Sequence, residues 1–240
     1  MRKDHRPYPV KRLHQHLERT WSEWFIAPHL DALGPDFQFM KPWNFKIHGR
    51  NISLGRCVHV ITASDRNVSL TTWAHPDGEG HIDIGDYALL CPGVRIDSAT
   101  RVSIGANTML AAGVYLTDAD WHDIYDRTKV IGQTAAVVLE DNVWIGDGAT
   151  VCKGVHIGQN SVIGTGAVVT SDIPANVIAA GNPARVIRAL DPQRDLVRRA
   201  DLLADAAKLN RDIDRLNRYL HGSNTWLNWL RTLIKPGTKD

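Results

Sequence analysis

The chain has 240 residues, a net charge of +2 and a composition that is 43% hydrophobic and 22% charged. These values are typical of a globular protein, and they exclude intrinsic disorder, collagen-like repeats and low-complexity material. The basic N-terminal stretch is not followed by an apolar segment, and no apolar stretch is long enough to span a membrane, which predicts a cytoplasmic protein. Cys57, Cys91 and Cys152 are far apart and form no CxxC, so we expect reduced thiols.

Residues 1–45 are predicted to form a helical segment. Their apolar residues recur at helical spacing until Pro28 ends the pattern. The residues concerned are Val10, Leu13, Leu17, Trp21, Trp24 and Phe25. We expect this helix to pack on the first coil of the domain that follows and to cap its open end. Residues 46–80 carry little pattern, and irregular coils are expected there.

A six-residue repeat dominates residues 46–190. Apolar residues recur at every sixth position at Leu139, Ile145, Val151, Ile157, Ile163, Val169 and Ala175. The same step is found upstream at Ile84, Leu90 and Ile96 and, after a slip of two residues, at Ile104, Leu110 and Leu116. This period fits neither an α-helix nor plain strand alternation, so the chain must turn every six residues and stack its aliphatics. The repeat predicts an all-β fold, a parallel β-helix; a doubly wound α/β domain or a β-sandwich would shift the phase at every loop.

One segment is too long for this repeat. From Leu116 to Leu139 is 23 residues, whereas three six-residue steps would take 18. The surplus predicts a polar and aromatic loop around residues 117–127, ejected from a rigid scaffold, where function concentrates. His122 lies there among four aspartates, including Asp120 and Asp123, any of which could accept the Nδ1 proton and fix the tautomer. Taken alone, His122 would more simply be a solvated surface histidine.

Residues 191–240 are predicted to form a tail of amphipathic helices, with Asp191 as the cap and Pro192 at the first helical position. An apolar stripe follows at Leu202, Ala206, Leu209, Ile213, Leu216 and Leu220. After a break at residues 222–224, a second short helix is rich in tryptophan. Residues 185–240 hold 12 basic and 7 acidic residues but no recognition motif, so nucleic-acid binding is not expected. Residues 225–235 either pack into an assembly or make a peripheral membrane contact.

Three sequence strings resemble the hexapeptide-repeat acyltransferases, most closely the maltose and galactoside O-acetyltransferase branch. They are DNVWIG at 141–146, GAVVTSDIP at 166–174 and AGNPARVIR at 180–188. The resemblance implies a left-handed β-helix acyltransferase domain, a homotrimer, and acetyl-CoA bound between neighbouring subunits without a metal. It also implies that His122 is the general base for an O-acyltransferase acting on a small-molecule hydroxyl, most simply that of a sugar.

Cofactor and acceptor residues are likewise implied by position. Thr165, Thr170 and Ser171 match contacts to the pantetheine arm and adenine end, and Arg185 and Arg188 match phosphate-binding arginines. Trp144 and Asp147 also match the cofactor region, although Asp147 replaces a serine and Trp144 can equally line the acceptor pocket.

On the acceptor side, Cys91 stands where sugar-acetylating relatives hold an asparagine. Arg95, Asp120 and Asp123 complete the expected acceptor set. Because that asparagine is missing, we expect an acceptor other than a simple galactoside or maltose. As a rung residue, Cys91 is better interpreted as a small hydrophobe than as a nucleophile.

Other functions stay open at this point. A metal-dependent hydratase like the γ-class carbonic anhydrases would use His81 and His122 as zinc ligands, but position 117 is threonine and the third histidine is missing. A catalytically silent solenoid binding protein would not need both His122 and the paired arginines. Transfer from an acyl carrier protein is disfavoured by the same arginines.

Overall fold

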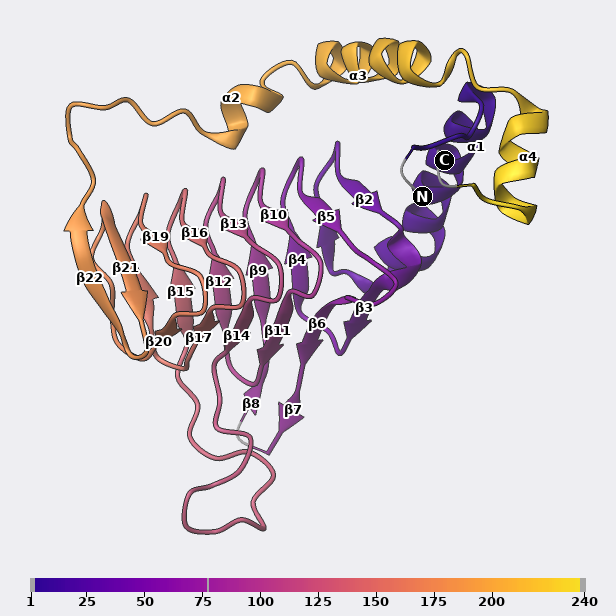
Figure 1. Ribbon diagram of the computed structural model, residues 1–240. Helices are drawn as coiled ribbons and strands as arrows, with labels where there is room; N and C mark the ends of the chain where they lie inside the picture. The colour runs from indigo at the N-terminus through magenta and orange to yellow at the C-terminus, as the bar shows by residue number, and fades with distance from the viewer. Residues whose placement is uncertain (1–2, 77, 238–240) are drawn as a thin grey trace.

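The chain winds into a three-sided prism of short strands (Figure 1). The computed structural model describes residues 3–76 and 78–237, and within them each coil passes through a first, a second and a third sheet in turn. Successive coils pair in parallel, as Ile104 with Leu139 and Leu110 with Ile145. The parallel β-helix predicted from the repeat is therefore confirmed, and the pairing fits the left-handed winding that the resemblance implies.

The strands are short, as a six-residue repeat requires. The first sheet contains β1 (Ala32–Leu33), β4 (Ile52–Leu54), β9 (Ile82–Ile84), β12 (Val102–Ile104), β15 (Val137–Leu139) and β18 (His156–Ile157). The second contains β2 (Gln38–Met40), β5 (His59–Ile61), β10 (Leu89–Leu90), β13 (Met109–Leu110), β16 (Trp144–Ile145), β19 (Val162–Ile163), β21 (Val177–Gly181) and β22 (Ala184–Ala189). The third contains β3 (Phe45–His48), β6 (Val68–Thr72), β11 (Arg95–Ser98), β14 (Tyr115–Thr117), β17 (Thr150–Val151) and β20 (Val168–Val169).

The predicted aliphatic series forms the core. In the second sheet Leu90, Leu110, Ile145 and Ile163 pair in register, and the equivalent residues of the other two sheets do the same. All of these side chains are buried, so each coil covers the apolar surface of the next. Ala175 is an exception, because Ile173 takes the core position beside Ile157 instead.

The glycine that follows the large aliphatic is required by the spacing between coils. A Cβ on Gly85 would lie 2.7 Å from the backbone nitrogen of Ala106 in the next coil, and one on Gly105 would lie 2.5 Å from the carbonyl carbon of Glu140. Neither glycine has a positive φ. Close approach of the next coil therefore explains why glycine follows the large aliphatic residue at these positions.

The first coils begin earlier than expected, since strands β1 and β2 already pair with β4 and β5. Residues 45–72 continue the parallel register, but a turn at Ala63 and Arg66 lengthens the step from β5 to β6 and a hairpin follows at residues 74–79, so the expected irregularity lies in the connections and not in the strand pairing. The division of the chain after residues 45 and 190 stays a prediction. The N-terminal helix α1 (Tyr8–Trp21) continues into a π-helical turn η1 (Ser22–Ile26) and 3₁₀ turns η2 (Ala27–His29) and η3 (Pro42–Asn44). It lies across the N-terminal end of the prism (Figure 1).

The predicted face of α1 does not make the packing contact. Ile26 joins the buried cluster with Phe37, Phe39 and Phe45. In contrast, Leu13 and Trp24 are exposed, and no residue of α1 itself is buried. Helical spacing identified the apolar stripe correctly but assigned it to the wrong side of the helix.

Insertions leave the prism at one corner, where the third sheet passes to the first. They are a hairpin of β7 (Ala74–His75) and β8 (Gly78–Glu79), a turn at residues 98–101, and the long loop at residues 118–136. They arise from consecutive coils, so they stack: the Trp73 amide donates to the Ser98 carbonyl at 2.9 Å, and His75 Nε2 donates to the Ala99 carbonyl at 2.9 Å.

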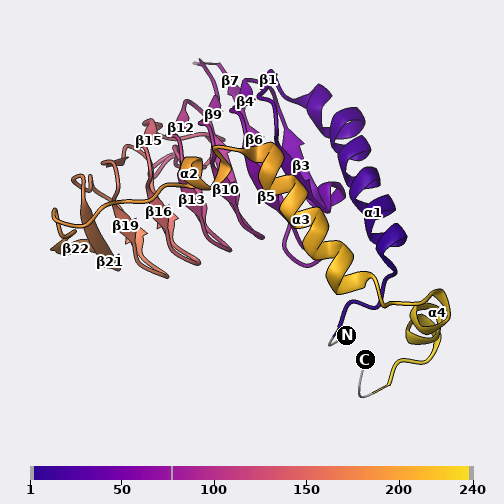
Figure 2. The same ribbon diagram turned by 90° about the horizontal axis from the view of Figure 1, so that it is seen from above.

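The C-terminal arm runs back along the prism to its N-terminal end (Figures 1 and 2). It contains α2 (Arg199–Leu203), α3 (Ala206–His221) and α4 (Trp226–Ile234). The expected helix start at Asp191 and Pro192 is wrong, because residues 190–198 lack a stripe that could be buried and run as an irregular connection. Arg199 Nε donates to the Tyr87 carbonyl at 2.7 Å, and Tyr8 Oη donates to Asp214 at 2.7 Å. Within residues 3–76 and 78–237, no helix has the length and apolarity needed to cross a bilayer.

Candidate active site

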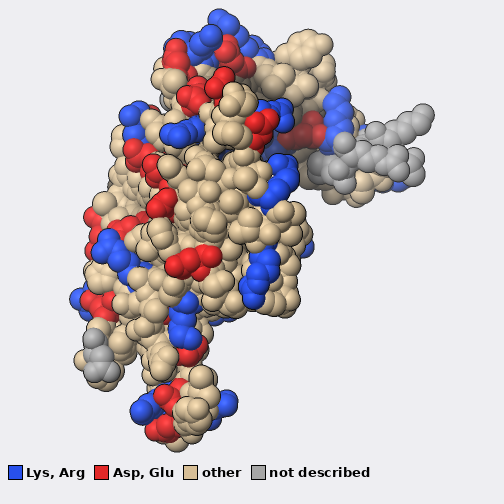
Figure 3. Space-filling model, turned by 90° about the vertical axis from the view of Figure 1, so that its left-hand side faces the viewer, with Lys and Arg blue, Asp and Glu red and all other residues tan. Residues whose placement is uncertain are grey.

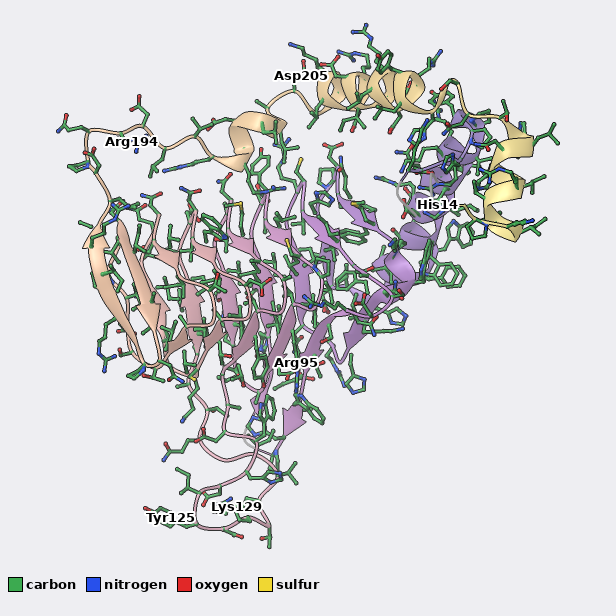
Figure 4. The ribbon with its side chains drawn as sticks, viewed as in Figure 1. His14, Arg95, Tyr125, Lys129, Arg194 and Asp205 are labelled. Carbon is green, nitrogen blue, oxygen red and sulfur yellow. The ribbon has the colours of Figure 1, made fainter. Side chains whose placement is uncertain are left out.

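The loop at residues 118–136 projects away from the prism, as the residue count predicted. Tyr125 and Lys129 lie at its far end, whereas Arg95 lies on the third sheet near its base (Figure 4). The space-filling view shows the loop standing clear of the body, with side chains of both charges at its tip (Figure 3). An imidazole carried here is presented beyond the surface of its own prism.

His122 is held by a backbone carbonyl. Its Nδ1 lies 3.3 Å from the Lys129 oxygen. Since a carbonyl can only accept a hydrogen bond, Nδ1 is the donor in this contact, and in a neutral imidazole the lone pair then lies on Nε2. That tautomer is the one a general base needs, and the His122 side chain is exposed on the loop.

The aspartates around His122 have other partners, which corrects the expectation that one of them fixes the tautomer. Asp120 pairs with Lys153 at 2.9 Å. Asp123 accepts backbone N–H bonds from Asp126 and Tyr125, which hold its pKa below the usual range. Whether Asp120 and Asp123 also contact an acceptor stays a prediction.

Asp118 anchors the base of the loop. Its carboxylate is fully buried and accepts three hydrogen bonds, from Ser98 Oγ at 2.6 Å, Ala99 N at 2.7 Å and Thr100 N at 2.9 Å. Its own carbonyl accepts from Ala135 N, at the other end of the loop. One side chain therefore fixes the loop to the turn of the preceding coil.

An aromatic wall supports the same corner. Trp121 Nε1 lies 3.1 Å from both the Tyr115 hydroxyl and Thr117 Oγ1, and the rings of Trp121 and Trp73 lie 5.8 Å apart. The Arg95 guanidinium lies over the Tyr115 ring at 4.8 Å and forms an ion pair with Asp97. Of the two expected acceptor residues outside the loop, Arg95 is therefore the one connected to this corner, through Tyr115 and Trp121.

The expected cofactor residues are distributed over two corners and the C-terminal end of the prism. Thr170 and Ser171 follow β20, at the same corner as the loop. Asp147 and Thr165 follow β16 and β19, at the corner between the second and third sheets, while Trp144 lies on the second sheet. A single chain does not bring this second group together with His122, because the third sheet separates them.

Arg185 and Arg188 lie on β22 at the end of the prism. Each donates to a neighbouring carbonyl, of Ala184 and Ala189 respectively, and across the described ranges neither forms an ion pair with a carboxylate. Both guanidinium groups are exposed. The pair therefore fits an incoming phosphate, since these charges have no protein counter-ion to lose.

Cys91 follows β10, at the same corner as Asp147 and away from the loop. Burial raises the pKa of its thiol, outweighing the effect of nearby Arg199. A thiol with a raised pKa carries little thiolate at neutral pH, so this position is unsuited to nucleophilic catalysis. Its expected role beside an acceptor stays a prediction.

The metal alternative gains no support from the geometry. His81 Nδ1 donates to the Glu79 carbonyl at 3.0 Å. In the part of the chain that the structure describes, no group of three or more histidine, cysteine, aspartate or glutamate residues could hold a metal ion.

Several residues of this site were missed by sequence reasoning. Asp118, Tyr115, Trp121 and Trp73 build the corner, but Asp118 binds residues 98–100 of the preceding coil and Trp121 contacts Trp73 from two coils back. Only the slip of two residues after Ile96 hinted at an irregular turn there. If it were known in advance that insertions from consecutive coils stack at one corner, the hydrogen bonds of Asp118 to residues 98–100 could have been predicted.

Comparison with known proteins agrees with this architecture. Residues 136–171 match the family model for the bacterial transferase hexapeptide (six repeats). The chain is 42% identical over 92 residues to the galactoside O-acetyltransferase of Escherichia coli K12, covering 38% of this chain and 45% of that protein. It is 31% identical over 134 residues to E. coli WbbJ, which is assigned as an O-acetyl transferase of lipopolysaccharide biosynthesis; this match covers 51% of the chain and 68% of WbbJ.

Coverage of the relatives is incomplete. The chain spans about half the length of several curated relatives that it matches, for example 55% of the galactoside O-acetyltransferase of Lactococcus lactis, to which it is 34% identical over 57% of its own length.

Two solved structures share the fold. One is the hexapeptide-repeat acetyltransferase VCA0836 of Vibrio cholerae, with a TM-score of 0.50 and 22% identity over 75% of this chain and 86% of that one. The other is the N-acyltransferase AntD of Bacillus cereus in complex with dTDP and 3-hydroxybutyryl-CoA, with a TM-score of 0.56 and 16% identity over 80% and 96%. With its stacked six-residue coils and these relatives, the chain belongs to the hexapeptide-repeat acyltransferase family.

Proposed function

We propose that this chain transfers an acyl group, most simply acetyl, from acyl-CoA to a hydroxyl of a carbohydrate-type acceptor, with His122 as the general base. The observation that carries the proposal is the hydrogen bond from His122 Nδ1 to the Lys129 carbonyl, which favours the neutral tautomer with its lone pair on Nε2, on an exposed loop. A solvated surface histidine has no reason to be held in one tautomer on a loop that is itself anchored by a buried carboxylate.

The proposed step needs a base because an alcohol is too weakly acidic to attack a thioester unaided. Nε2 takes the hydroxyl proton as the oxygen attacks the carbonyl carbon. The tetrahedral intermediate then collapses, the C–S bond breaks, and the imidazolium returns the proton to the departing thiolate of CoA. Positioning both substrates contributes further, in favourable cases about 7–11 kcal/mol.

The proposed assembly is a homotrimer with acyl-CoA between neighbouring prisms. Its support is geometric: the loop extends beyond its own prism, and Asp147, Thr165 and Trp144 lie across the third sheet from it. A neighbouring copy could supply the second group of residues to the His122 loop of the first. Backbone amides near Trp144 would then stabilise the oxyanion.

The experiment that tests the activity is a thiol-release assay with acetyl-CoA and a panel of sugars, amino sugars, serine and antibiotics. We expect CoA release that depends on a sugar-type acceptor. Release with none of the panel, under conditions where the protein binds CoA, would contradict the proposal.

The proposed phosphate contacts predict a selective loss of affinity. Arg185→Ala should weaken CoA binding by about 10- to 100-fold, since a hydrogen bond to a charged group contributes about 1.5–3 kcal/mol. Binding of desphospho-CoA should fall less. Calorimetric titration of both ligands measures the difference, with Arg50→Ala, at an exposed arginine of the N-terminal coils, as the control. Equal losses for both ligands would exclude Arg185 from contact with the 3′-phosphate, the group that desphospho-CoA lacks.

A further inference from the structure

The helix α1 is oriented with a polar side inward. Ser22, which follows it, is 1% exposed and donates to the Glu18 carbonyl at 2.7 Å, while the Glu18 side chain accepts from the Lys41 amide at 2.8 Å. On the other side, Leu13, Leu17 and Trp24 face solvent, with Trp24 74% exposed. The more hydrophobic face of this segment is therefore uncovered.

The helix α4 also packs through polar residues and exposes its apolar side, and it does so to a greater degree than α1. Its inward residues are polar: Thr232 is 5% exposed, and Asn228 Nδ2 lies 3.1 Å from His5 Nδ1. Its outward residues are apolar, with Leu227 and Ile234 exposed by 82% and 84%. A helix that docks through asparagine and threonine while presenting leucine, isoleucine and tryptophan leaves its apolar face for another partner.

Positive charge accompanies these apolar faces. Residues 215–235 contain four arginine or lysine residues and no aspartate or glutamate. Between α1 and α3 lies a groove of about 730 Å³ whose lining includes Arg12, Arg211, Arg215 and Arg218. The carboxylate of Asp214 in this groove is bound by Tyr8, Arg12 and Arg218, and Arg215 pairs with Asp212 beside it, whereas the four arginines of the lining face this one acidic side chain. The groove therefore presents more positive than negative charge.

Both helices lie at the same end of the molecule. Figures 1 and 2 show α1 across the N-terminal end of the prism and α4 beyond it, away from the sheets. Asn224, just before α4, donates to the carbonyls of Asp4 and Arg6 and so ties α4 to the start of the chain. The apolar and cationic surfaces thus lie at one end of the molecule, which we call the N-terminal face. It consists of Leu13, Leu17 and Trp24, the arginines of the groove, and the exposed Leu227 and Ile234 of α4.

We propose that the N-terminal face docks peripherally on an anionic lipid surface. The apolar side of α4 would enter the interface, and the arginines would pair with headgroup phosphates. Charge favours lipid over a second copy of the chain as the partner, because a self-contact through this face would place the same cations against one another. Such docking would hold the protein at a surface that also carries lipid-linked acceptors; this consequence rests on the proposed function, whereas the docking itself does not.

Flotation with lipid vesicles tests the proposal, using the full chain and vesicles of phosphatidylcholine with or without phosphatidylglycerol. We expect the protein to float with the anionic vesicles and to dissociate as salt is raised. Leu227→Ser combined with Ile234→Ser should lower the partition coefficient about tenfold or more, since two exposed apolar side chains are lost from the interface. Because both are exposed in the chain itself, the fold should tolerate the change.

Two further variants complete the test. Ile187→Ser combined with Val197→Ser removes two apolar residues outside α1 and α4 that are exposed by 64% and 84%, and should leave flotation unchanged. Arg215→Gln combined with Lys235→Gln should weaken binding to the anionic vesicles selectively. Sedimentation velocity on each variant reports the assembly state.

The proposal is overturned if the wild-type protein does not float, or if the α4 variant floats as well as the wild type. It is also overturned if the α4 variant loses subunit contacts without any change in lipid binding, because the face would then be an interface between copies. Thiol release with a soluble acceptor is measured separately, so failure of docking and failure of acyl transfer give different results.

Discussion

His122→Ala should lower kcat for acyl transfer by about 10²- to 10⁴-fold, the usual contribution of a positioned general base. The affinity for CoA should stay nearly unchanged, because the His122 loop lies at a different place from Arg185 and Arg188 on β22. Steady-state thiol release gives the first quantity and calorimetric titration the second. Loss of CoA affinity with unchanged turnover of bound substrate would contradict the role.

Two substitutions in the same loop serve as controls. Tyr125→Ala changes the most exposed aromatic of the loop tip and should leave kcat within about twofold of wild type, as expected for a surface residue. Lys129→Ala should also retain activity, because the backbone carbonyl of residue 129, and not its side chain, fixes the His122 ring. A large loss in Lys129→Ala would show that the carbonyl is not the orienting group.

Asp118→Ala should destabilise the protein by about 2 kcal/mol or more. The substitution leaves the buried amide of Ala99 and the half-buried amide of Thr100 without an acceptor, whereas Ser98 Oγ can still donate to the His81 carbonyl, and each unpaired group costs about 1–3 kcal/mol. It should also lower kcat, because the loop that carries His122 loses its anchor. Urea unfolding and thiol release measure the two effects.

The matched control is Asp120→Ala, two residues along the chain. Asp120 forms a half-buried ion pair with Lys153, and pairs near the surface contribute about 0–1 kcal/mol. If both variants lose the same stability, the buried network around Asp118 is not the anchor of the loop.

The core and the position of the loop could be predicted because each depends only on the number of residues between successive aliphatic positions. Leu90, Leu110, Ile145 and Ile163 stack because every coil has the same length, and the loop was found because residues 116–139 break that length. Neither inference needed knowledge of which coils touch.

The details of the site could not be predicted for the opposite reason. Asp118 reaches Ser98 and Thr100 only because two coils insert residues at the same corner, which no short sequence pattern encodes. The four aspartates near His122 suggested that a carboxylate would orient the ring. In the folded loop the backbone carbonyl of Lys129 is the group that accepts the hydrogen bond from Nδ1.

Helical periodicity had a related weakness. It identified an apolar stripe on the segment around Leu13 and Trp24, but periodicity gives the existence of a face and not the direction in which it points. The missing helix at Pro192 has another cause. Its cap and proline are good start signals, but among residues 193–198 only Leu196 and Val197 are apolar and both stay exposed, and isolated helices of that length are marginal in water.

The returning arm changes how such an array can come apart. In a stack of repeats whose neighbours alone interact, the terminal units fray independently of each other. Here the segment that follows the last strand rests on the opposite extremity of the molecule, through Asp214 and Tyr8. Unfolding that starts at either end of the prism therefore breaks the contact between Asp214 and Tyr8. We expect the two ends to unfold together, and not one coil at a time.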